Sequence, residues 1–139
     1  MDRSNFLQMV ADRLRCDQRR ADALTTVVFQ ELRARLTPKE AADVASQLPG
    51  PLKTSWLEDE KPTREVRRTH RDEFIGRVRQ RAVLTDDHEA ERAVQAVFGT
   101  LQYALGSPHG TEGEAGHIFA QLPKDLKTLW LQASRGPTS

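Results

Sequence analysis

The chain has 139 residues, of which 37% are hydrophobic and 29% charged, and its formal net charge is +1. This size suits one compact domain that folds without disulfides, and the balanced charge excludes a chain that is basic throughout. No apolar run approaches the length that spans a bilayer, and the first residues lack the apolar core of a signal peptide. The one cysteine, Cys16, cannot form an internal disulfide, so we expect a cytoplasmic protein without membrane association.

Apolar residues spaced three or four positions apart predict helices from the start of the chain. Phe6, Val10 and Leu14 mark one face of a first helix. We expect this helix to begin after Ser4 as its N-cap and to end near Arg15. Such a pattern is typical of a helix that buries one face and exposes the other.

Further helices are predicted before the middle of the chain. Asp17 is the expected N-cap of a long helix that runs to about Leu36. The residues at 37–40, Thr-Pro-Lys-Glu, combine an N-cap, a proline at the first helical position and a glutamate three residues after the cap, which predicts a capping box. Pro49 ends that helix, and apolar residues within 52–57 predict a short fourth one.

A motif at the end of this region occurs again near the end of the chain. Residues 47–57 and 121–131 are identical at eight of eleven positions, and both of the chain's tryptophans lie in them. Internal similarity of this kind is the signature of a repeated structural unit. The shared positions of interest are Gln47, Leu48, Pro49 and Trp56 in the first copy and Gln121, Leu122, Pro123 and Trp130 in the second.

Other residues of the first half also recur in order in the second half. The offset between matched residues increases late in the chain, which locates an insertion at 106–110, and a surface loop tolerates such an insertion. Thr111 and Glu114 are expected to form a second capping box. The matched pairs are Phe6 and Phe74, Val10 and Val78, Asp17 and Asp86, Leu32 and Leu101, and Thr37 and Thr111.

We therefore expect an all-α protein, a tandem duplication of a four-helix unit that is packed as one helical globule. The expected units are residues 3–58 and 70–133, joined by a charged linker at 59–69 and followed by a disordered tail at 134–139. No strand is expected, because no stretch shows period-two alternation or a hairpin dipeptide. The apolar faces of the two units should pack together, since a unit of this length is marginally stable alone.

Helical units that begin with Phe-x3-Val and end with Gln-Leu-Pro and Leu-x3-Trp-Leu resemble the DUF2267 family, an uncharacterised bacterial family of two-repeat proteins. The resemblance covers nearly the whole chain, and its most specific part is the Gln-Leu-Pro element at 47–49 and 121–123. It implies an all-helical bacterial protein and no particular reaction. The chain departs from the family in its glycine-rich insertion and in the arginines around the linker.

The repeated motif has a structural and a functional interpretation. Gln47 and Gln121 are expected to satisfy backbone carbonyls that the following proline frees from the helix. The alternative is a symmetric pair of polar groups that line a shared groove. Trp56 and Trp130 are expected to cover the core, with a role as stacking platforms for a ligand as the alternative.

The stretch 61–81 holds eight lysines and arginines against three carboxylates. Arginine makes bidentate contacts with phosphate, so Arg64, Arg67, Arg68 and Arg71 are candidate binding residues for phosphate or nucleic acid. No aromatic residues alternate with these arginines, and the sequence pI of about 8.0 is below the range typical of nucleic-acid-binding domains. We favour an acidic protein partner, a second copy of the chain, or solvent as the neighbour of these arginines.

Glu114 and His117 have the Glu-x-x-His spacing of carboxylate-bridged metal sites in helical bundles, which makes them candidate metal ligands. The position equivalent to His117 in the first half is Asp43, so the second ligand pair of such a site is missing. We expect no bound cofactor.

For nucleophilic catalysis the one candidate thiol is Cys16, whose pKa neighbouring arginines could lower. No histidine is near it in sequence, and no Gly-x-Ser-x-Gly motif or phosphate-binding glycine loop occurs. We assign no catalytic residue. The expected function is a non-catalytic binding or interaction protein.

Overall fold

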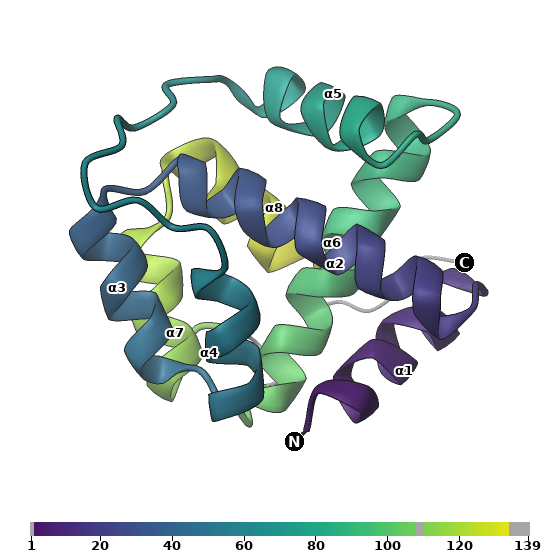
Figure 1. The fold of residues 1–139 in the computed structure, drawn as a ribbon, viewed down its shortest axis with the longest axis horizontal. Coiled ribbons are helices and arrows are strands. Elements are labelled where there is room, and N and C mark those ends of the chain that lie inside the picture. Colours follow the sequence, from purple (N-terminus) through teal and green to yellow (C-terminus); the bar gives the residue numbers. More distant parts are fainter. Residues whose placement is uncertain (1, 108–109, 134–139) are drawn as a thin grey trace.

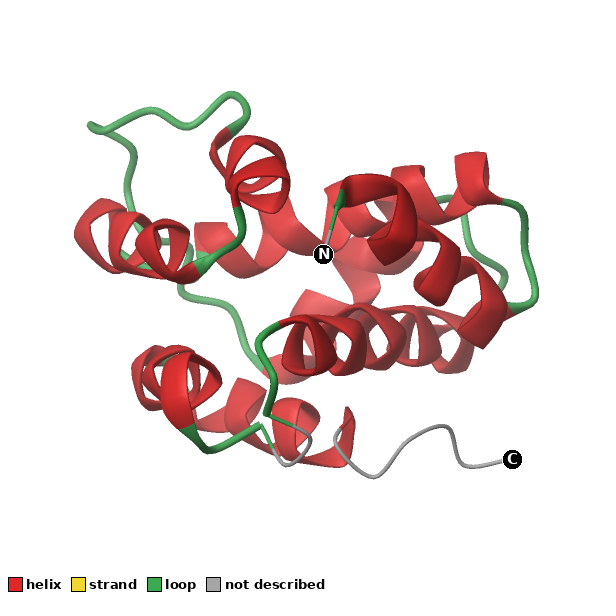
Figure 2. Cartoon of the chain, turned by 90° about the horizontal axis from the view of Figure 1, so that it is seen from below, coloured by secondary structure: helices red, strands yellow, loops and turns green. Residues whose placement is uncertain are grey.

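The computed structural model describes residues 2–107 and 110–133, and these form eight α-helices and no strand (Figures 1 and 2). The prediction of an all-α protein is therefore confirmed for this part of the chain. The expected tail at 134–139 and two residues of the insertion at 106–110 lie outside the described residues. The helices are α1 (Arg3–Leu14), α2 (Gln18–Ala34), α3 (Pro38–Gln47), α4 (Gly50–Leu57), α5 (Arg71–Arg81), α6 (Asp87–Ala104), α7 (Gly113–Gln121) and α8 (Lys124–Ala133).

The two long helices, α2 and α6, cross near the middle of the molecule and contact each other (Figure 1). The helix α1 packs against both of them, and so does α5. The helix α4 packs on α2 and α8 packs on α6, while α3 and α7 contact each other at one end of the molecule. Helices from both halves of the sequence therefore share one core.

The core is built around aromatic side chains that are almost fully buried. The rings of Phe6, Phe29 and Trp56 form one group, with centroids 6.1 and 5.6 Å apart for successive pairs. Phe98 and Trp130 form another, with centroids 5.3 Å apart. The prediction that both tryptophans are buried is confirmed. None of the helices in the described residues is long and apolar enough to cross a membrane.

Several of the predicted helix starts are confirmed by their caps. The side chains of Asp17 and Asp86 accept hydrogen bonds from backbone N–H groups in the first turns of α2 and α6, at 2.7 and 2.8 Å. Thr37 and Glu40 form the predicted capping box at α3. The prediction of Ser4 as the N-cap of α1 is wrong, because the Asp2 side chain accepts from the backbone N–H of Asn5 at 2.7 Å.

The second predicted capping box, at Thr111 and Glu114, is also wrong. The helix α7 begins at Gly113, its N-cap is Glu112, and no side chain caps it. A methyl group at Gly116 would lie 2.5 Å from the carbonyl oxygen of Thr111, so Thr111 lies over the first turn of the helix instead of ahead of it. Glycine at 116 permits this close approach, and the glycine at 113, with φ of +57°, permits the turn that leads into the helix.

Each tryptophan is held by polar contacts at both its ring and its backbone. The indole N–H of Trp56 donates to the carbonyl oxygen of Ala41 at 2.9 Å, and that of Trp130 donates to the carbonyl oxygen of Gly110 at 2.6 Å. The backbone carbonyl of Trp56 accepts from Arg33, and that of Trp130 accepts from Gln102. These bonds satisfy groups that are costly to bury unpaired, and they fix the ends of α4 and α8.

Candidate binding cleft beside α8

Between Leu57 and Arg71 the chain contains no helix, and it passes around the edge of the molecule to α5 (Figure 1). This segment is nevertheless attached to the end of α2. The Arg64 guanidinium donates to the carbonyl oxygen of Leu36 at 2.7 Å, and the backbone N–H of Arg67 donates to the carbonyl oxygen of Ala34 at 2.8 Å. The linker therefore has a defined path across α2.

A buried carboxylate holds the linker and α5 to α2. The side chain of Glu31, on α2, is only 2% exposed and accepts from Arg67, Arg77 and Arg81 at 3.0, 2.8 and 2.9 Å. Burial acts to raise the pKa of Glu31, but hydrogen bonds from Arg77 and Arg81 outweigh it, so the pKa is lowered. Glu31 cannot be singled out from the sequence, because nothing in its neighbourhood on α2 distinguishes it from a surface glutamate.

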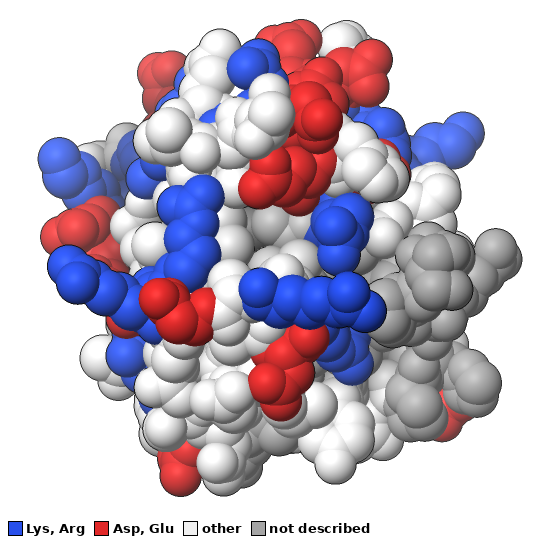
Figure 3. Space-filling view, turned by 90° about the vertical axis from the view of Figure 1, so that its right-hand side faces the viewer, with Lys and Arg blue, Asp and Glu red and all other residues white. Residues whose placement is uncertain are grey.

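Most other arginines of the stretch 61–81 are also paired with carboxylates. Arg64 bonds Glu60 at 2.6 Å, Arg79 bonds Asp87 at 2.8 Å, and Arg71 forms an ion pair with Glu91. On the side of the molecule that lies at the right of Figure 1, basic and acidic side chains are also interspersed (Figure 3). Arg68 is exposed and has no ion pair within the described part of the chain.

Arg67 and Arg68 lie at a cleft of about 630 Å³ between the linker and the N-terminal half of α8. The cleft holds four lysine or arginine side chains and one carboxylate, so its lining is strongly basic. It combines residues from α2, the linker and α8, three segments that are far apart in the sequence. The lining residues are Arg35, Val66, Arg67, Arg68, Thr69, His70, Pro123, Lys124, Asp125 and Thr128.

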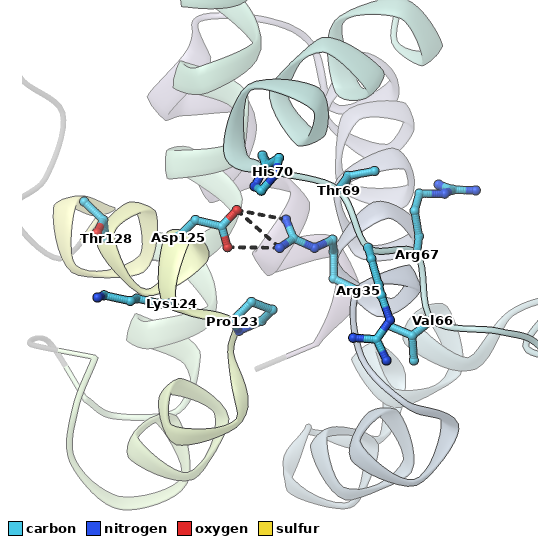
Figure 4. Close-up of a pocket in the computed structure, with 10 residues that line it drawn as sticks. Arg35, Val66, Arg67, Thr69, His70, Pro123, Lys124, Asp125 and Thr128 are labelled. Carbon is cyan, nitrogen blue, oxygen red and sulfur yellow. Dashed lines mark hydrogen bonds and ion pairs between the residues drawn. The ribbon is translucent and has the colours of Figure 1, made fainter.

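One ion pair spans this cleft. The guanidinium of Arg35 makes three hydrogen bonds of 3.0–3.2 Å with the two carboxylate oxygens of Asp125. Figure 4 shows the two side chains pointing toward each other from opposite walls, with His70 on one side of the pair and Pro123 on the other. The Arg35 side chain is 8% exposed and that of Asp125 is 28% exposed. The arrangement can therefore bind a planar carboxylate at a mostly buried guanidinium.

The family model described as "Uncharacterized conserved protein (DUF2267)" matches residues 3–129 of the chain. The chain belongs to this family. No curated protein matches the chain. The resemblance inferred from the repeated motif is therefore confirmed. The description of the family names no activity.

The repeated Gln-Leu-Pro elements do not line this cleft, apart from Pro123. The side-chain oxygens of Gln47 and Gln121 are both buried without a hydrogen-bond partner. No side-chain hydrogen bond to a freed carbonyl is found for either glutamine within residues 2–107 and 110–133, contrary to the structural interpretation of the sequence. The adjacent Leu48 and Leu122 are buried, so the motif positions apolar residues at the ends of α3 and α7.

The candidate metal ligands Glu114 and His117 are both exposed on α7. The described residues include no group of three or more histidine, cysteine, aspartate or glutamate side chains that could hold a metal ion. The structure therefore brings no further ligand to this pair from the described parts of other helices.

The thiol of Cys16 lies half-buried at the junction of α1 and α2. Burial raises the pKa of this thiol, Asp17 raises it further, and Arg20 acts in the opposite direction. The expectation that neighbouring arginines could lower the pKa is wrong, because burial and the carboxylate of Asp17 have the larger effect. Cys16 therefore lacks the thiolate character of an activated nucleophile.

A second cleft, of about 610 Å³, lies between the start of α1 and α4. It contains one arginine, Arg3, and one carboxylate, Glu58, and lacks a cluster of cations. Arg3 is occupied by hydrogen bonds to Asp22 and to the Ser55 hydroxyl, at 2.5 and 3.1 Å. The cleft beside α8 is therefore the more basic of these two.

Proposed function

We propose that this protein is a non-catalytic binding module that takes an acidic segment of a protein partner into the cleft beside α8. The observation that carries the proposal is the presence of two cations in the cleft, Arg68 and Lys124, that have no ion pair within the described residues. Most other arginines of the stretch 61–81 already have carboxylate partners. Unpaired cations at the rim of a cleft attract and orient an acidic partner.

We also propose that the module consists of two equivalent four-helix units, α1–α4 and α5–α8. Equivalent helices make corresponding contacts, since α1 packs on α2 and α6 while α5 packs on α6 and α2. Arg33 and Gln102 occupy matched positions in the sequence and donate to the carbonyls of the two matched tryptophans. In the second cleft, Pro51 takes the position of Asp125. The basic lining of the cleft beside α8 is therefore not repeated in the second cleft.

An acidic protein segment suits this cleft better than a nucleic acid does. The lining contains no phenylalanine, tyrosine or tryptophan on which a base could stack. Most other arginines of the stretch 61–81 are paired with carboxylates, so beyond the two unpaired cations of the cleft this stretch offers a phosphate backbone little free positive charge.

The proposal is tested with a fluorescein-labelled hexaglutamate peptide and fluorescence anisotropy at low and at high salt. The double variant Arg68→Ala/Lys124→Ala is expected to weaken binding roughly tenfold. The matched control is Arg19→Ala/Lys53→Ala, which also removes one arginine and one lysine, both exposed and outside the cleft. The control variant should keep most of the wild-type affinity for the peptide. Binding to the wild type and to the control variant should weaken as the salt concentration rises.

If the two double variants lose equal affinity for the peptide, the loss reflects only the change in net charge. That result would contradict a binding site at the cleft. Tighter binding of a labelled single-stranded DNA of equal charge would favour a nucleic-acid ligand instead. Association of the protein with itself, which Arg68→Ala/Lys124→Ala abolishes in sedimentation experiments, would identify a second copy as the partner.

A further inference from the structure

The Arg35–Asp125 pair lies in the middle of the proposed binding cleft, and its geometry is that of a bound carboxylate. Both oxygens of Asp125 face the guanidinium, as the carboxylate of a ligand would (Figure 4). Arg35 has no other acceptor within the described residues, and both of its terminal nitrogens donate to Asp125. A ligand carboxylate can take this end-on, bidentate position on the most buried cation of the cleft only when Asp125 leaves it.

The two members of the pair differ in how firmly they are held. Arg35 is 8% exposed, whereas Asp125 is 28% exposed and stands at the first turn of α8. Within the described residues, the one other hydrogen bond to the Asp125 carboxylate comes from the backbone N–H of Leu126, at 3.0 Å. A change of side-chain conformation at Asp125 would thus open the guanidinium, while the guanidinium itself would stay in its place.

The repeated framework does not require this pair. The positions that match Arg35 and Asp125 in the other half are Ala104 and Pro51, which cannot form an ion pair. Ala104 and Pro51 lie in helices that form without such a pair, so the framework is compatible with its absence. A role in binding explains the pair better than a requirement of the fold does.

We infer that the guanidinium of Arg35 is the carboxylate subsite of the cleft and that Asp125 is a built-in competitor that a glutamate or aspartate of the partner displaces. This inference rests on the proposed function and adds the chemical group that is recognised and the residue that regulates access to it. The exchange replaces one charge-assisted, bidentate pair with another of the same kind, so the subsite itself loses no hydrogen bond. Arg68 and Lys124 attract the segment, and Arg35 binds its carboxylate.

If Asp125 competes with the ligand for Arg35, Asp125→Asn should bind the peptide more tightly than the wild type. The amide oxygen of asparagine can still accept from the Leu126 N–H, but the negative charge that holds Arg35 is lost. We expect Asp125→Asn to bind the hexaglutamate peptide roughly tenfold more tightly than the wild type. Adding Arg35→Gln to Asp125→Asn should abolish this gain, because the subsite is then missing.

The matched control is Asp22→Asn. It also removes a carboxylate from an arginine, since Asp22 bonds Arg3 at 2.5 Å, and it changes the net charge by the same amount. A gain that depends only on net charge would appear in both variants. We expect Asp22→Asn to bind the peptide as the wild type does, with circular dichroism showing that every variant is folded.

The outcomes separate this inference from the proposed function. Wild-type binding that depends on Arg68 and Lys124, combined with no gain in Asp125→Asn, would overturn the subsite and leave the binding cleft in place. A gain that survives Arg35→Gln would also overturn the subsite. Absence of peptide binding in both the wild type and Asp125→Asn would overturn the two proposals together. In the ¹⁵N NMR spectrum, the Arg35 Nε–H signal should shift on peptide addition in Asp125→Asn, and an unchanged signal would contradict contact with the carboxylate.

Discussion

The side chain of Arg33 bonds the backbone of Trp56: its guanidinium donates to the carbonyl oxygen of Trp56 at 2.6 Å. The same nitrogen donates to the carbonyl oxygen of Glu58 at 2.8 Å. Both carbonyls lie where α4 ends and have no continuing helix to bond them. A buried arginine therefore serves as the C-terminal cap of α4 and as the point from which the linker departs.

Replacing Arg33 should destabilise the protein through these carbonyls. We expect Arg33→Met to lower the free energy of unfolding by about 2–3 kcal/mol, because the carbonyls of Trp56 and Glu58 lose their donor. At the matched position of the second half, Gln102 donates to the carbonyl oxygen of Trp130. Because Arg33→Gln also keeps a side-chain donor, it should cost less, about 1–2 kcal/mol. Urea unfolding followed by tryptophan fluorescence measures both, and equal costs would show that the donor does not matter.

Stability should fall at acidic pH because of Glu31. Its pKa is lowered in the folded protein, so its contribution is fully present above its ordinary pKa of about 4.3 and is lost as pH falls through the folded value. At pH 7 we expect Glu31→Gln to cost about 2–3 kcal/mol. This is less than the ~3–5 kcal/mol of a wholly buried pair, because the three arginines are 37–39% exposed.

The difference between wild type and Glu31→Gln should shrink below about pH 4. The control is the exposed Glu65, where Glu65→Gln should leave the pH dependence of unfolding unchanged. A Glu31→Gln protein whose acid unfolding matches that of the wild type would contradict the role of the buried carboxylate.

Two helical glycines should respond to alanine in opposite ways. A methyl group at Gly116 would lie 2.5 Å from the backbone oxygen of Thr111, so Gly116→Ala should cost about 1–3 kcal/mol. A methyl group at Gly76, in α5, meets no atom within 4 Å, so Gly76→Ala should raise stability by about 0.5–1 kcal/mol. Thermal unfolding distinguishes the two, and a stabilised Gly116→Ala protein would show that the loop before α7 adapts freely.

Both tryptophans should be essential for stability. Trp56→Ala and Trp130→Ala should each cost about 3–5 kcal/mol, because each removes a fully buried ring. Trp130→Phe keeps most of the ring but leaves the carbonyl of Gly110 unpaired, and it should cost about 1–3 kcal/mol. Calorimetry tests these values, and a cost below about 1 kcal/mol for either alanine variant would contradict its place in the core.

Local patterns were enough to predict the helices and the core. The spacing of Phe6 and Val10, the capping box at Thr37 and the N-cap at Asp86 depend on residues within a few positions of one another. The prediction of a second capping box was wrong because the close approach of Thr111 to Gly116 depends on the path of the inserted loop. Spacing alone does not show whether a loop passes ahead of a helix or over it.

The cleft could not be predicted in this way. Arg35 and Asp125 are ninety positions apart, and Glu31 is thirty-six to fifty positions from its arginines. A basic stretch in a sequence gives its charge but not the carboxylates that fold onto it. The sequence therefore indicated Arg67 and Arg68 and missed Arg35, Lys124 and Asp125, which lie at the end of α2 and the start of α8.

The attachment of the linker to α2 affects how readily proteases cleave the chain there. Trypsin cuts after lysine and arginine in segments that can adopt an extended form in its active site, and the stretch 61–81 offers eight such residues. Lys61 precedes a proline, which blocks cleavage, and Arg64 and Arg67 are bonded to α2 or its end. Arg68 is exposed and has no ion pair within the described residues, so among the sites of this stretch we expect trypsin to cut there first. A bound acidic segment would cover that bond, and the rate of the first cut would then report occupancy of the cleft.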